Sequence, residues 1–465
     1  MSEAGSASRE VSRQSLRATL DALEERGELR RVGVPVDPRF EISACLEVDP
    51  AGPALLFESV VGGALPVVGN VLNSRRRMAD ALGVGLSELQ ERIIDAISRP
   101  VPPREVADGP CQEVVVDAPD LLSELPLPWF FEQETGPYVT AGAIVARDPV
   151  TGAGNLSIAR LKPLGESRAL IGIAPNHHLA VMARIAAERR VKLPLAVAIG
   201  VHPGVLIAAC LYLGYDEDEL GCAGRLLGEP VEVVTGARPG VVVPAQAEVV
   251  LEATLDPEES VIEGPVSEYH GMYEDYGAGY VVTVDRLTRR RDAVLHVVQP
   301  GHNPEHMLLG AVAIAAGLLR GLRASFPFVR AVALPPGGSG RLSVVVSVDV
   351  DLLRPGSVRR VMLAVWAALS IVRWVTVVGE DVDPWDEEQV EWARMCFVRA
   401  DADLLVVSGM SADRSDPLEE GAGTVAKLGM DATPKRVEGL GSLRARVPEE
   451  AAEAARRVLG EDRGG

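Results

Sequence analysis

The middle of the chain sets the strongest limit on its fold, because it consists of short β-rich runs separated by turns. Many strands of this kind favour a barrel or a sandwich. Two helices interrupt them, one after His178 and one after Pro203. The predicted strands between Cys111 and Gln299 are Thr140–Arg147, Ala169–Ala174, Leu195–Gly200, Val231–Val234, Glu248–Ala253 and Tyr280–Arg286.

The segments on either side follow other patterns. A helix with Ser15 as its N-cap opens the first segment, which mixes short strands with helices up to a proline-rich boundary near residue 103. After Pro304 an apolar helix leads into alternating strands and helices, ending with a strand at Asp403–Val407, and this order predicts parallel pairing. We therefore expect a mixed α/β (α+β) chain. Its predicted parts are a leader at 1–13, an α/β domain at 14–110, a β-rich domain at 111–303, a connecting helix at 304–324, an α/β domain at 325–445 and a helix with a tail at 446–465.

Charge and apolar patterning exclude several classes of protein. The formal net charge of -20 would repel a nucleic-acid backbone or an anionic membrane surface. The longest apolar run, Leu193–Leu213, is interrupted by His202-Pro203-Gly204, so it predicts a strand, a turn and a helix rather than a membrane span. Scattered cysteines without a C-x-x-C pair, and a polar N-terminus without a signal peptide, indicate a cytoplasmic protein with reduced thiols.

The common signatures of nucleotide and hydrolase sites are absent from the sequence. It contains no G-x-G-x-x-G after a strand, no Walker lysine loop, no G-x-S-x-G elbow and no H-E-x-x-H pair. The sequence therefore gives no support for the enzyme classes that these motifs define. The candidate functional residues are instead polar residues in apolar surroundings.

The segment Glu263–Tyr273 is one such place, because it sets the carboxylates of Glu263 and Glu268 beside a histidine and two tyrosines. Gly264-Pro265 and Gly271 predict a fixed turn. Carboxylates held on a turn are candidates for acid–base catalysis, because burial and neighbouring charge shift their proton affinities towards neutrality. A solvated acidic loop is the alternative that this segment alone leaves open. Three residues of the segment receive no role: Tyr269, His270 and Tyr273.

Other polar positions have both a functional and an ordinary interpretation. Arg160 is suited to a bidentate contact with a substrate carboxylate, but in a regular strand it faces away from Asn155, so a shared site requires a bulge or twist. His178 opens a helix, where free N–H groups favour phosphate. Glu232 lies in an apolar strand, where an inward carboxylate needs a partner or a cation. The alternatives are a surface ion pair for Arg160, a helix cap for His178 and a solvent-facing strand position for Glu232. Lys427 either balances a phosphate or is an ordinary exposed lysine.

Asn155, His178 and Glu232 together offer oxygen and imidazole ligands suited to manganese or magnesium, with phosphate completing the shell. Taken in order, all these segments resemble the UbiD family of decarboxylases, whose members use prenylated flavin mononucleotide (prenylated FMN). The resemblance covers nearly the whole chain, from the Ser15 helix to Lys427–Thr433. Its most specific parts are the spacing of Asn155 and Arg160, His178, Glu232 before Val233-Val234, Val243–Glu248 and Glu263–Tyr273.

The resemblance implies a central split β-barrel that binds the flavin. It implies that Asn155, His178 and Glu232 bind a divalent metal, usually manganese, which holds the cofactor phosphate, often with a potassium ion nearby. Lys427 would reach the phosphate from the C-terminal domain. The residues implied to lie along the flavin are Ile158, Ala159, Arg160 and His177.

The resemblance also implies the catalytic groups. Glu268 matches the family's proton donor, and Arg160 and Glu263 match its partners in an Arg-Glu-Glu network. Loss of carbon dioxide from an unsaturated carbon leaves an unstable anion, so the reaction needs an electron sink that side chains do not provide. The implied enzyme is a carboxy-lyase that reversibly and non-oxidatively decarboxylates an α,β-unsaturated or (hetero)aromatic carboxylic acid.

Two alternatives stay open, an ordinary flavin reductase or oxidase and a non-catalytic UbiD-like partner subunit. A flavin prenyltransferase would supply the cofactor, and a homodimer or larger homo-oligomer is expected through the C-terminal α/β domain. Ala159 and Ser267 depart from residues common in the family. Because pocket shape follows such side chains, the resemblance does not identify the acid.

Overall fold

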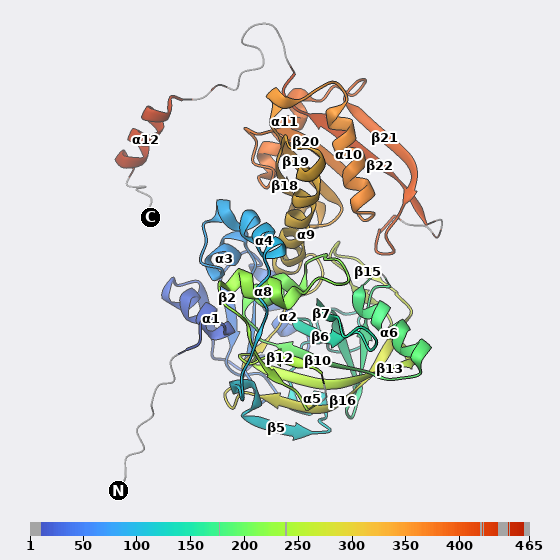
Figure 1. The fold of residues 1–465 in the computed structure, drawn as a ribbon. Helices are drawn as coiled ribbons and strands as arrows, with labels where there is room; N and C mark the ends of the chain where they lie inside the picture. The colour runs from blue at the N-terminus through green and yellow to red at the C-terminus, as the bar shows by residue number, and fades with distance from the viewer. Residues whose placement is uncertain are drawn as a thin grey trace.

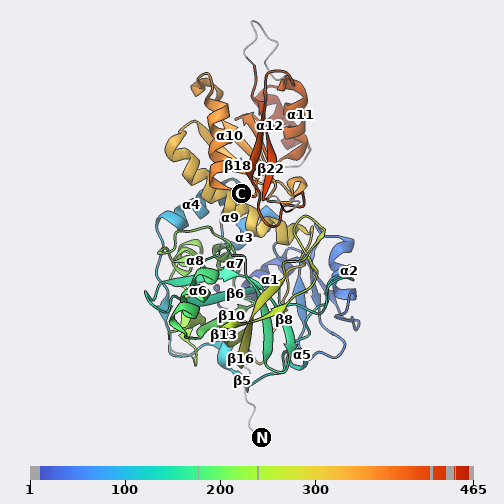
Figure 2. The same cartoon turned by 90° about the vertical axis from the view of Figure 1, so that its right-hand side faces the viewer.

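The computed structural model describes residues 11–175, 177–237, 240–418, 421, 423–435, 445 and 447–459. Residues 1–10 of the predicted leader, Asn176 and residues 460–465 of the predicted tail lie outside this part of the chain. The main body has two lobes, with the long helix α9 (Pro304–Ser325) where they meet (Figure 1). Figure 2 shows the same two lobes after a quarter turn. The mixed class of helix and strand predicted from the sequence is confirmed.

The N-terminal part begins with α1 (Leu16–Glu25), which starts at Ser15 because the Ser15 hydroxyl accepts a hydrogen bond from the Ala18 N–H. A four-stranded sheet follows in the order β1-β2-β3-β17. Its last strand comes from beyond the central domain, so the chain returns to this sheet before entering α9. The bounds are β1 Leu29–Val32, β2 Ala54–Phe57, β3 Val67–Gly69, β17 Leu295–His296, α2 Glu41–Val48, α3 Arg75–Ala81 and α4 Leu89–Ser98.

The central part is dominated by an eight-stranded sheet in which every pair of neighbours is antiparallel. The strand order is β7-β6-β10-β13-β16-β9-β8, with β5 added to β16. Apolar side chains of both faces are buried, as expected for a sheet covered on each side. The bounds are β5 Val114–Asp117, β6 Gly142–Arg147, β7 Gly154–Ile158, β8 Arg160–Gly165, β9 Arg168–Gly172, β10 Leu193–Ile199, β13 Val249–Ile262 and β16 Ala278–Arg289.

The two end strands of this sheet, β7 and β8, are consecutive in the chain and joined through Ala159. Within the described residues no ladder pairs β7 with β8, so the sheet is an open path and a closed barrel is not found. The junction at Ala159 nevertheless brings one end of the path next to the other. It also supplies the break in the strand that Asn155 and Arg160 need in order to face one site.

Four α-helices, of which the short α5 (Leu121–Glu124) comes first, and two small sheets complete the described residues of this part. The predicted apolar run at Leu193–Leu213 forms β10 and α7 (Pro203–Ala209), as expected. The predicted strand Val231–Val234 corresponds to β11 (Glu232–Thr235), which lies outside the large sheet, between β12 and β4. The other bounds are α6 His178–Arg189, α8 Glu219–Leu227, β4 Arg104–Glu105, β12 Val242–Pro244, β14 Val266–Ser267 and β15 Tyr273–Glu274.

Helix α9 has two buried faces, which explains its apolar composition. Leu309 and Val312 pack into the core shared with the N-terminal and central parts, whereas Ile314 and Leu318 pack into the C-terminal core. The helix is long and apolar enough to cross a membrane, but 72% of its most apolar window is buried inside the fold. A core helix between two domains accounts for this pattern.

The C-terminal part is a five-stranded sheet in the order β18-β19-β20-β22-β21. The pairs β19–β20 and β20–β22 are parallel, as the strand-helix-strand order predicts. The predicted strand at Asp403–Val407 differs, because β21 is an antiparallel edge strand paired with β22. The bounds are β18 Val329–Ala333, β19 Ser343–Val348, β20 Trp374–Gly379, β21 Leu404–Ser411, β22 Thr424–Ala432, α10 Ser357–Ala368, α11 Glu387–Phe397 and α12 Glu449–Val458.

Candidate active site

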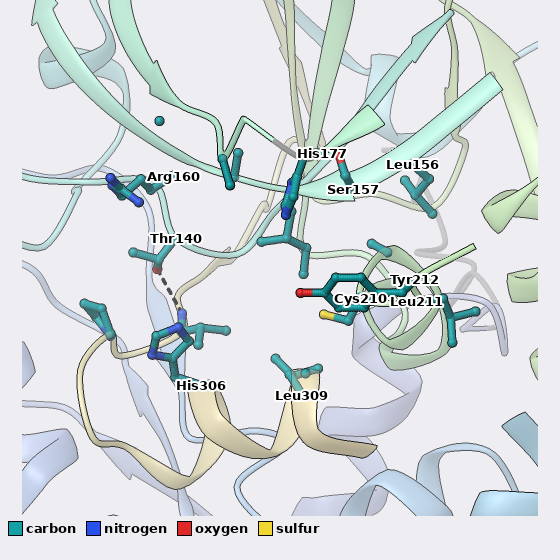
Figure 3. A pocket seen from close by; sticks show the side chains of 18 of the residues that line it. Thr140, Leu156, Ser157, Arg160, His177, Cys210, Leu211, Tyr212, His306 and Leu309 are labelled. Atoms are coloured by element: carbon teal, nitrogen blue, oxygen red, sulfur yellow. Dashed lines mark hydrogen bonds between the residues drawn. The ribbon is translucent and has the colours of Figure 1, made fainter. Parts of the chain in front are cut away.

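A cavity of about 360 Å³ lies between the β7–β8 junction and α9. Leu156, Ser157 and Arg160 line it from the strands, and His306 and Leu309 line it from the helix (Figure 3). A third side consists of the last residue of α7, Ala209, and the four residues that follow it, up to Leu213. The cavity therefore collects residues from three separate parts of the chain, and two of the predicted functional groups lie at different places along its wall.

The first group surrounds Arg160, the first residue of β8. Its Nε and Nη2 donate to the two carboxylate oxygens of Glu263 at 2.6 and 2.7 Å, a bidentate geometry. Its Nη1 lies 3.9 Å from Oε1 of Glu268. Gly172, opposite Arg160 on β9, leaves the space for the guanidinium, because a Cβ there would lie 2.9 Å from Cζ of Arg160.

Electrostatics at this group are balanced within the chain. Burial alone would lower the pKa of Arg160, but its hydrogen bonds to Glu263 and its attraction to Glu268 outweigh that effect and raise the pKa. Glu263 is buried and Glu268 is half-buried. Of these three side chains Arg160 lines the cavity, and Glu268 lies 3.9 Å from its guanidinium.

The turn that carries Glu268 is tied to several neighbours. Strands β14 and β15 form its base, and the Gly271 N–H donates to the Glu268 carbonyl at 2.8 Å. The ring of Tyr276 lies 5.3 Å from Cζ of Arg160. Burial, followed by the charge of Glu268, raises the pKa of the Tyr276 hydroxyl, so Tyr276 stays neutral.

The three residues of the turn that had no predicted role all support its conformation. The Tyr269 hydroxyl donates to the Ser415 carbonyl of the C-terminal domain at 3.0 Å. His270 lies 3.3 Å from Glu274 across the hairpin, and the Tyr273 hydroxyl accepts from the Gln133 N–H. The turn is therefore held by its own hairpin and by two other segments.

The second group contains two of the three predicted metal ligands, Asn155 and His178. Both line the cavity, and Asn155 is buried. The third residue beside them is Glu219, the first residue of α8. Its Oε2 accepts from the Leu156 N–H at 3.0 Å, and its Oε1 lies 4.0 Å from Nδ1 of His178. Among the described residues, no lysine or arginine pairs with Glu219.

Glu232, the predicted third metal ligand, does not belong to this group. It lies on β11, accepts a hydrogen bond from Arg104 Nη2 at 2.7 Å and does not line the cavity. Its strand is in a separate small sheet, where alternation turns the side chain towards a surface arginine. The structure therefore does not bring Glu232 to Asn155 and His178, and the carboxylate that lies beside them is that of Glu219.

The environment of Glu219 is unusual for a carboxylate. The side chain is almost completely buried, and desolvation raises the pKa of its carboxyl to about 7. The described residues contain no group of three His, Cys, Asp or Glu side chains positioned for a metal. The set found here consists of one amide, one imidazole and one carboxylate, a donor combination that suits a divalent cation.

The sequence reasoning missed Glu219 because Asp216–Glu219 reads as an acidic helix start. Asp218 does cap α8, since its side chain accepts from the Leu220 N–H. A signal was nevertheless present, because Glu219 lies at a helix position followed by Leu220 and Cys222, which are buried. A carboxylate in that apolar surrounding needs a partner.

Of the remaining predicted cofactor contacts, some line the cavity and one does not. Ile158, Ala159 and His177 line the cavity together with Arg160. Lys427 does not, because it is buried in β22 and its Nζ donates to the Ser370 carbonyl. Burial lowers the pKa of Lys427. In this structure its ammonium lies in the C-terminal core and not in the cavity wall.

Comparison with known proteins matches almost the whole chain to one family. Profiles of the N-terminal, Rift-related and C-terminal domains of 3-octaprenyl-4-hydroxybenzoate carboxy-lyase match residues 20–97, 104–303 and 307–432. The solved structure of the UbiD-class enzyme HmfF from Pelotomaculum thermopropionicum, in complex with FMN, is 37% identical and has a TM-score of 0.90. The match covers 94% of this chain and 98% of that chain.

Two further solved structures agree with this assignment. The 3,4-dihydroxybenzoic acid decarboxylase of Enterobacter cloacae is 26% identical, with a TM-score of 0.86 over 94% of this chain and 96% of its own. The vanillic acid decarboxylase of Sedimentibacter hydroxybenzoicus, in a closed form, is 28% identical, with a TM-score of 0.84 over 97% of this chain and 100% of its own. The chain therefore belongs to the UbiD family of decarboxylases.

Proposed function

We propose that this carboxy-lyase uses prenylated FMN to decarboxylate an α,β-unsaturated or (hetero)aromatic carboxylic acid. The observation that carries the proposal is the pairing of Arg160 with Glu263 in the cavity wall, 3.9 Å from Glu268. Complexes of HmfF with FMN and with prenylated FMN support the choice of cofactor. A reverse carboxylation at high carbon dioxide follows from the same proposal.

A divalent metal fits the group formed by Asn155, His178 and Glu219. The buried carboxylate of Glu219 has no cationic partner in the described part of the chain, and its raised pKa reflects that lack. A cation such as Mn²⁺ or Mg²⁺ would compensate this charge and hold a cofactor phosphate beside the N-terminus of α6. The accompanying potassium ion remains a prediction.

When bound, the modified flavin supplies the electron sink that decarboxylation at an unsaturated carbon requires. Arg160 is placed to orient the substrate carboxylate, because one of its Nη atoms is not used by Glu263. Glu263, which is buried, balances the positive charge of Arg160. The charge of Arg160 is therefore shared between two carboxylates and does not act on Glu268 alone. Glu268 then delivers a proton to the carbon that has lost carbon dioxide.

Reconstitution tests the proposal directly. Apoprotein loaded anaerobically with prenylated FMN, Mn²⁺ and K⁺ is expected to release carbon dioxide from at least one acid in a panel of acrylic, furan, pyrrole and hydroxybenzoic acids. Mass spectrometry of the bound cofactor separates this outcome from an ordinary flavin enzyme, because the prenyl group adds a ring. Binding of unmodified FMN with oxidase or reductase turnover, or no binding of flavin and metal at all, would contradict the proposal.

We further propose that the C-terminal domain mediates self-association. A dimeric form of HmfF supports a homo-oligomer for this family. The edge strand β21 exposes Val406, and β20, which lies on the other side of β22, exposes Trp374. Unpaired strand edges with apolar side chains favour pairing with a second copy. Light scattering of the intact protein measures the oligomeric state.

A further inference from the structure

Residues 133–135, which lie in the connection between α5 and β6, contact the Glu263–Tyr273 turn at three places. Each of the three residues forms one of these contacts through its backbone or its side chain. The hydrogen-bonded pairs are Gln133 with Tyr273, Glu134 with Ser267 and Thr135 with Glu263. Two of the contacts precede Glu268 in the turn and one follows it, so the 133–135 segment holds the proposed proton donor from both sides.

The contact between Glu134 and Ser267 is the closest of the three to Glu268 along the chain. Oε1 of Glu134 accepts from the Ser267 hydroxyl at 2.8 Å and from the Ser267 N–H at 3.3 Å. Its Oε2 accepts from the Phe131 N–H at 3.2 Å. Both oxygens of the carboxylate are therefore used, and one of them binds the residue directly before Glu268.

The surroundings of Glu134 make this contact costly to lose. The side chain is buried and lines the cavity, and no lysine or arginine of the described residues forms an ion pair with it. Burial raises the pKa of the Glu134 carboxyl, and the hydrogen bonds from Ser267 and Phe131 oppose that effect. A buried carboxylate without a cationic partner depends on its neutral donors, so Ser267 is held where it can donate.

The contact at Glu263 acts on the backbone of the residue whose carboxylate binds Arg160. The Glu263 carbonyl accepts from the Thr135 hydroxyl at 2.9 Å and from Nζ of Lys162 at 2.8 Å. Lys162, on β8, also donates to the Thr135 hydroxyl. Gly264 leaves room for the threonine, because a Cβ there would lie 3.0 Å from Cγ2 of Thr135. The 133–135 segment is thus tied to the same strand that carries Arg160.

We infer that Glu134 is a positioning residue for the proposed proton donor, because by holding Ser267 it sets where the Glu268 carboxyl lies relative to the substrate carbon. The inference rests on the proposed function, since it takes Glu268 as the acid. Proton delivery depends on the geometry of the donor, and a misplacement of about 1 Å costs about 100-fold in rate. The flavin and the metal are assigned to other residues, so the effect is expected in kcat and not in cofactor binding.

Steady-state kinetics of the reconstituted full-length protein test the inference. Glu134→Gln keeps the side-chain size and loses one acceptor oxygen, so kcat should fall about 10-fold to 100-fold while KM changes by less than about threefold. Ser267→Ala removes only the hydroxyl and should lower kcat about threefold to 10-fold. Ser267→Thr keeps a hydroxyl and should restore most of the rate. Glu132→Gln, at an exposed position two residues earlier, is the matched control and should behave as wild type.

The solvent isotope effect separates positioning from a general structural role. A displaced acid makes proton delivery the slow step, so deuterated water should lower kcat more in Glu134→Gln and Ser267→Ala than in wild type. In the double variant kcat should fall no further than in Glu134→Gln, because both changes act on one contact. An unchanged isotope effect, or a loss of flavin that accounts for the lower rate, would overturn the inference.

Hydrogen exchange distinguishes failure of this inference from failure of the proposed function. Amides of residues 263–273 should exchange faster in Glu134→Gln than in wild type, and mass spectrometry of the full-length protein measures this without turnover. Unchanged exchange, or faster exchange with full activity, would overturn the inference. Faster exchange supports the hold of Glu134 on the turn even if wild type decarboxylates no acid, which would contradict only the proposed function.

Discussion

The two groups of polar residues at the cavity differ in whether a buried carboxylate has a cationic partner. At the β7–β8 junction, Arg160 meets Glu263 at 2.6 Å, so the buried acid has a cation from the chain itself. At the start of α8, Glu219 accepts a hydrogen bond from the Leu156 N–H and lies 4.0 Å from Nδ1 of His178. No lysine or arginine of the described residues pairs with it, and desolvation raises its pKa to about 7. The first group is electrostatically complete in the polypeptide alone. In the proposed function a divalent cation would complete the second group and couple it to the cofactor phosphate.

This difference separates the tasks of the two groups. A balanced Arg–Glu pair can be rigid before any ligand arrives, as orientation of a substrate and transfer of a proton require. An unbalanced carboxylate is destabilised until a cation is bound, so cofactor loading should stabilise the protein. Four measurements test the contrast, from the largest expected effect to the smallest.

The largest effect is expected at the acid–base group. Glu268→Gln removes the proposed proton donor and keeps the side-chain size, so kcat should fall by about 10²-fold to 10⁴-fold. Cofactor occupancy should not change, because Glu268 is not among the residues proposed to hold the cofactor. Turnover is followed as release of carbon dioxide. Glu258→Gln, at an exposed position of β13 outside the turn, serves as the control, and full activity of Glu268→Gln would remove Glu268 from the mechanism.

At the second group, Glu219→Gln should weaken the binding of Mn²⁺ and of the cofactor. Removing a ligating carboxylate is expected to cost about 100-fold or more in metal affinity, since loss of an outer partner alone costs about 10-fold to 100-fold. Titration calorimetry of the apoprotein with Mn²⁺ measures it. Glu232→Gln is the matched control, because this variant loses only a surface pair with Arg104. The reverse order of effects would restore Glu232 as the ligand.

The pKa of Glu219 predicts how the stability of the metal-free protein depends on pH. Since the folded pKa of about 7 exceeds the ordinary value of 4.5, the folded state holds a proton that the unfolded state has lost between these values. The free energy of unfolding should therefore decrease by about 3 kcal/mol as pH rises from 4.5 to 7. Denaturant unfolding of wild type and Glu219→Gln measures the difference, and parallel pH profiles for the two proteins would contradict it.

The smallest effect is expected where the acid–base group touches the C-terminal domain. Tyr269→Phe removes the hydroxyl that donates to the Ser415 carbonyl and should cost about 1 kcal/mol in the free energy of unfolding, because the carbonyl loses its partner. Tyr273→Phe, whose hydroxyl is more exposed, should cost less. Thermal unfolding compares the two variants. A larger loss in Tyr273→Phe would mean that the hairpin, not the domain contact, holds the turn.

Much of the fold follows from local signals that the sequence carries. The Ser15 cap, the break at His202-Pro203-Gly204 and the apolar helix after Pro304 all appear where expected. The last predicted strand, Asp403–Val407, forms as a strand, but its antiparallel pairing was not expected. Strand direction depends on which neighbour a segment meets, and local propensity carries little information about that.

Some residues of the candidate site could likewise be predicted from the sequence, whereas the positions of others depend on the tertiary structure. Asn155, Arg160, His178 and the Glu263–Tyr273 turn could be selected from residue types in sequence order, and the structure brings Arg160 to Glu263. Lys427 was expected at the cavity but is buried in the C-terminal sheet. The residues around Lys427 come from segments that are distant in the sequence. The motif around the lysine therefore does not predict them.

The sequence alone therefore determined the family, the carboxy-lyase class and the residue types available for the chemistry. Only the tertiary structure decided which glutamate joins Asn155 and His178, because that choice depends on α8 starting beside β7 while β11 lies in another sheet. It also decided that Arg160 reaches its partners, since the chain passes from one edge of the sheet to the other at Ala159. A carboxylate obtains its role from neighbours in space, and these neighbours are set by packing over long sequence distances.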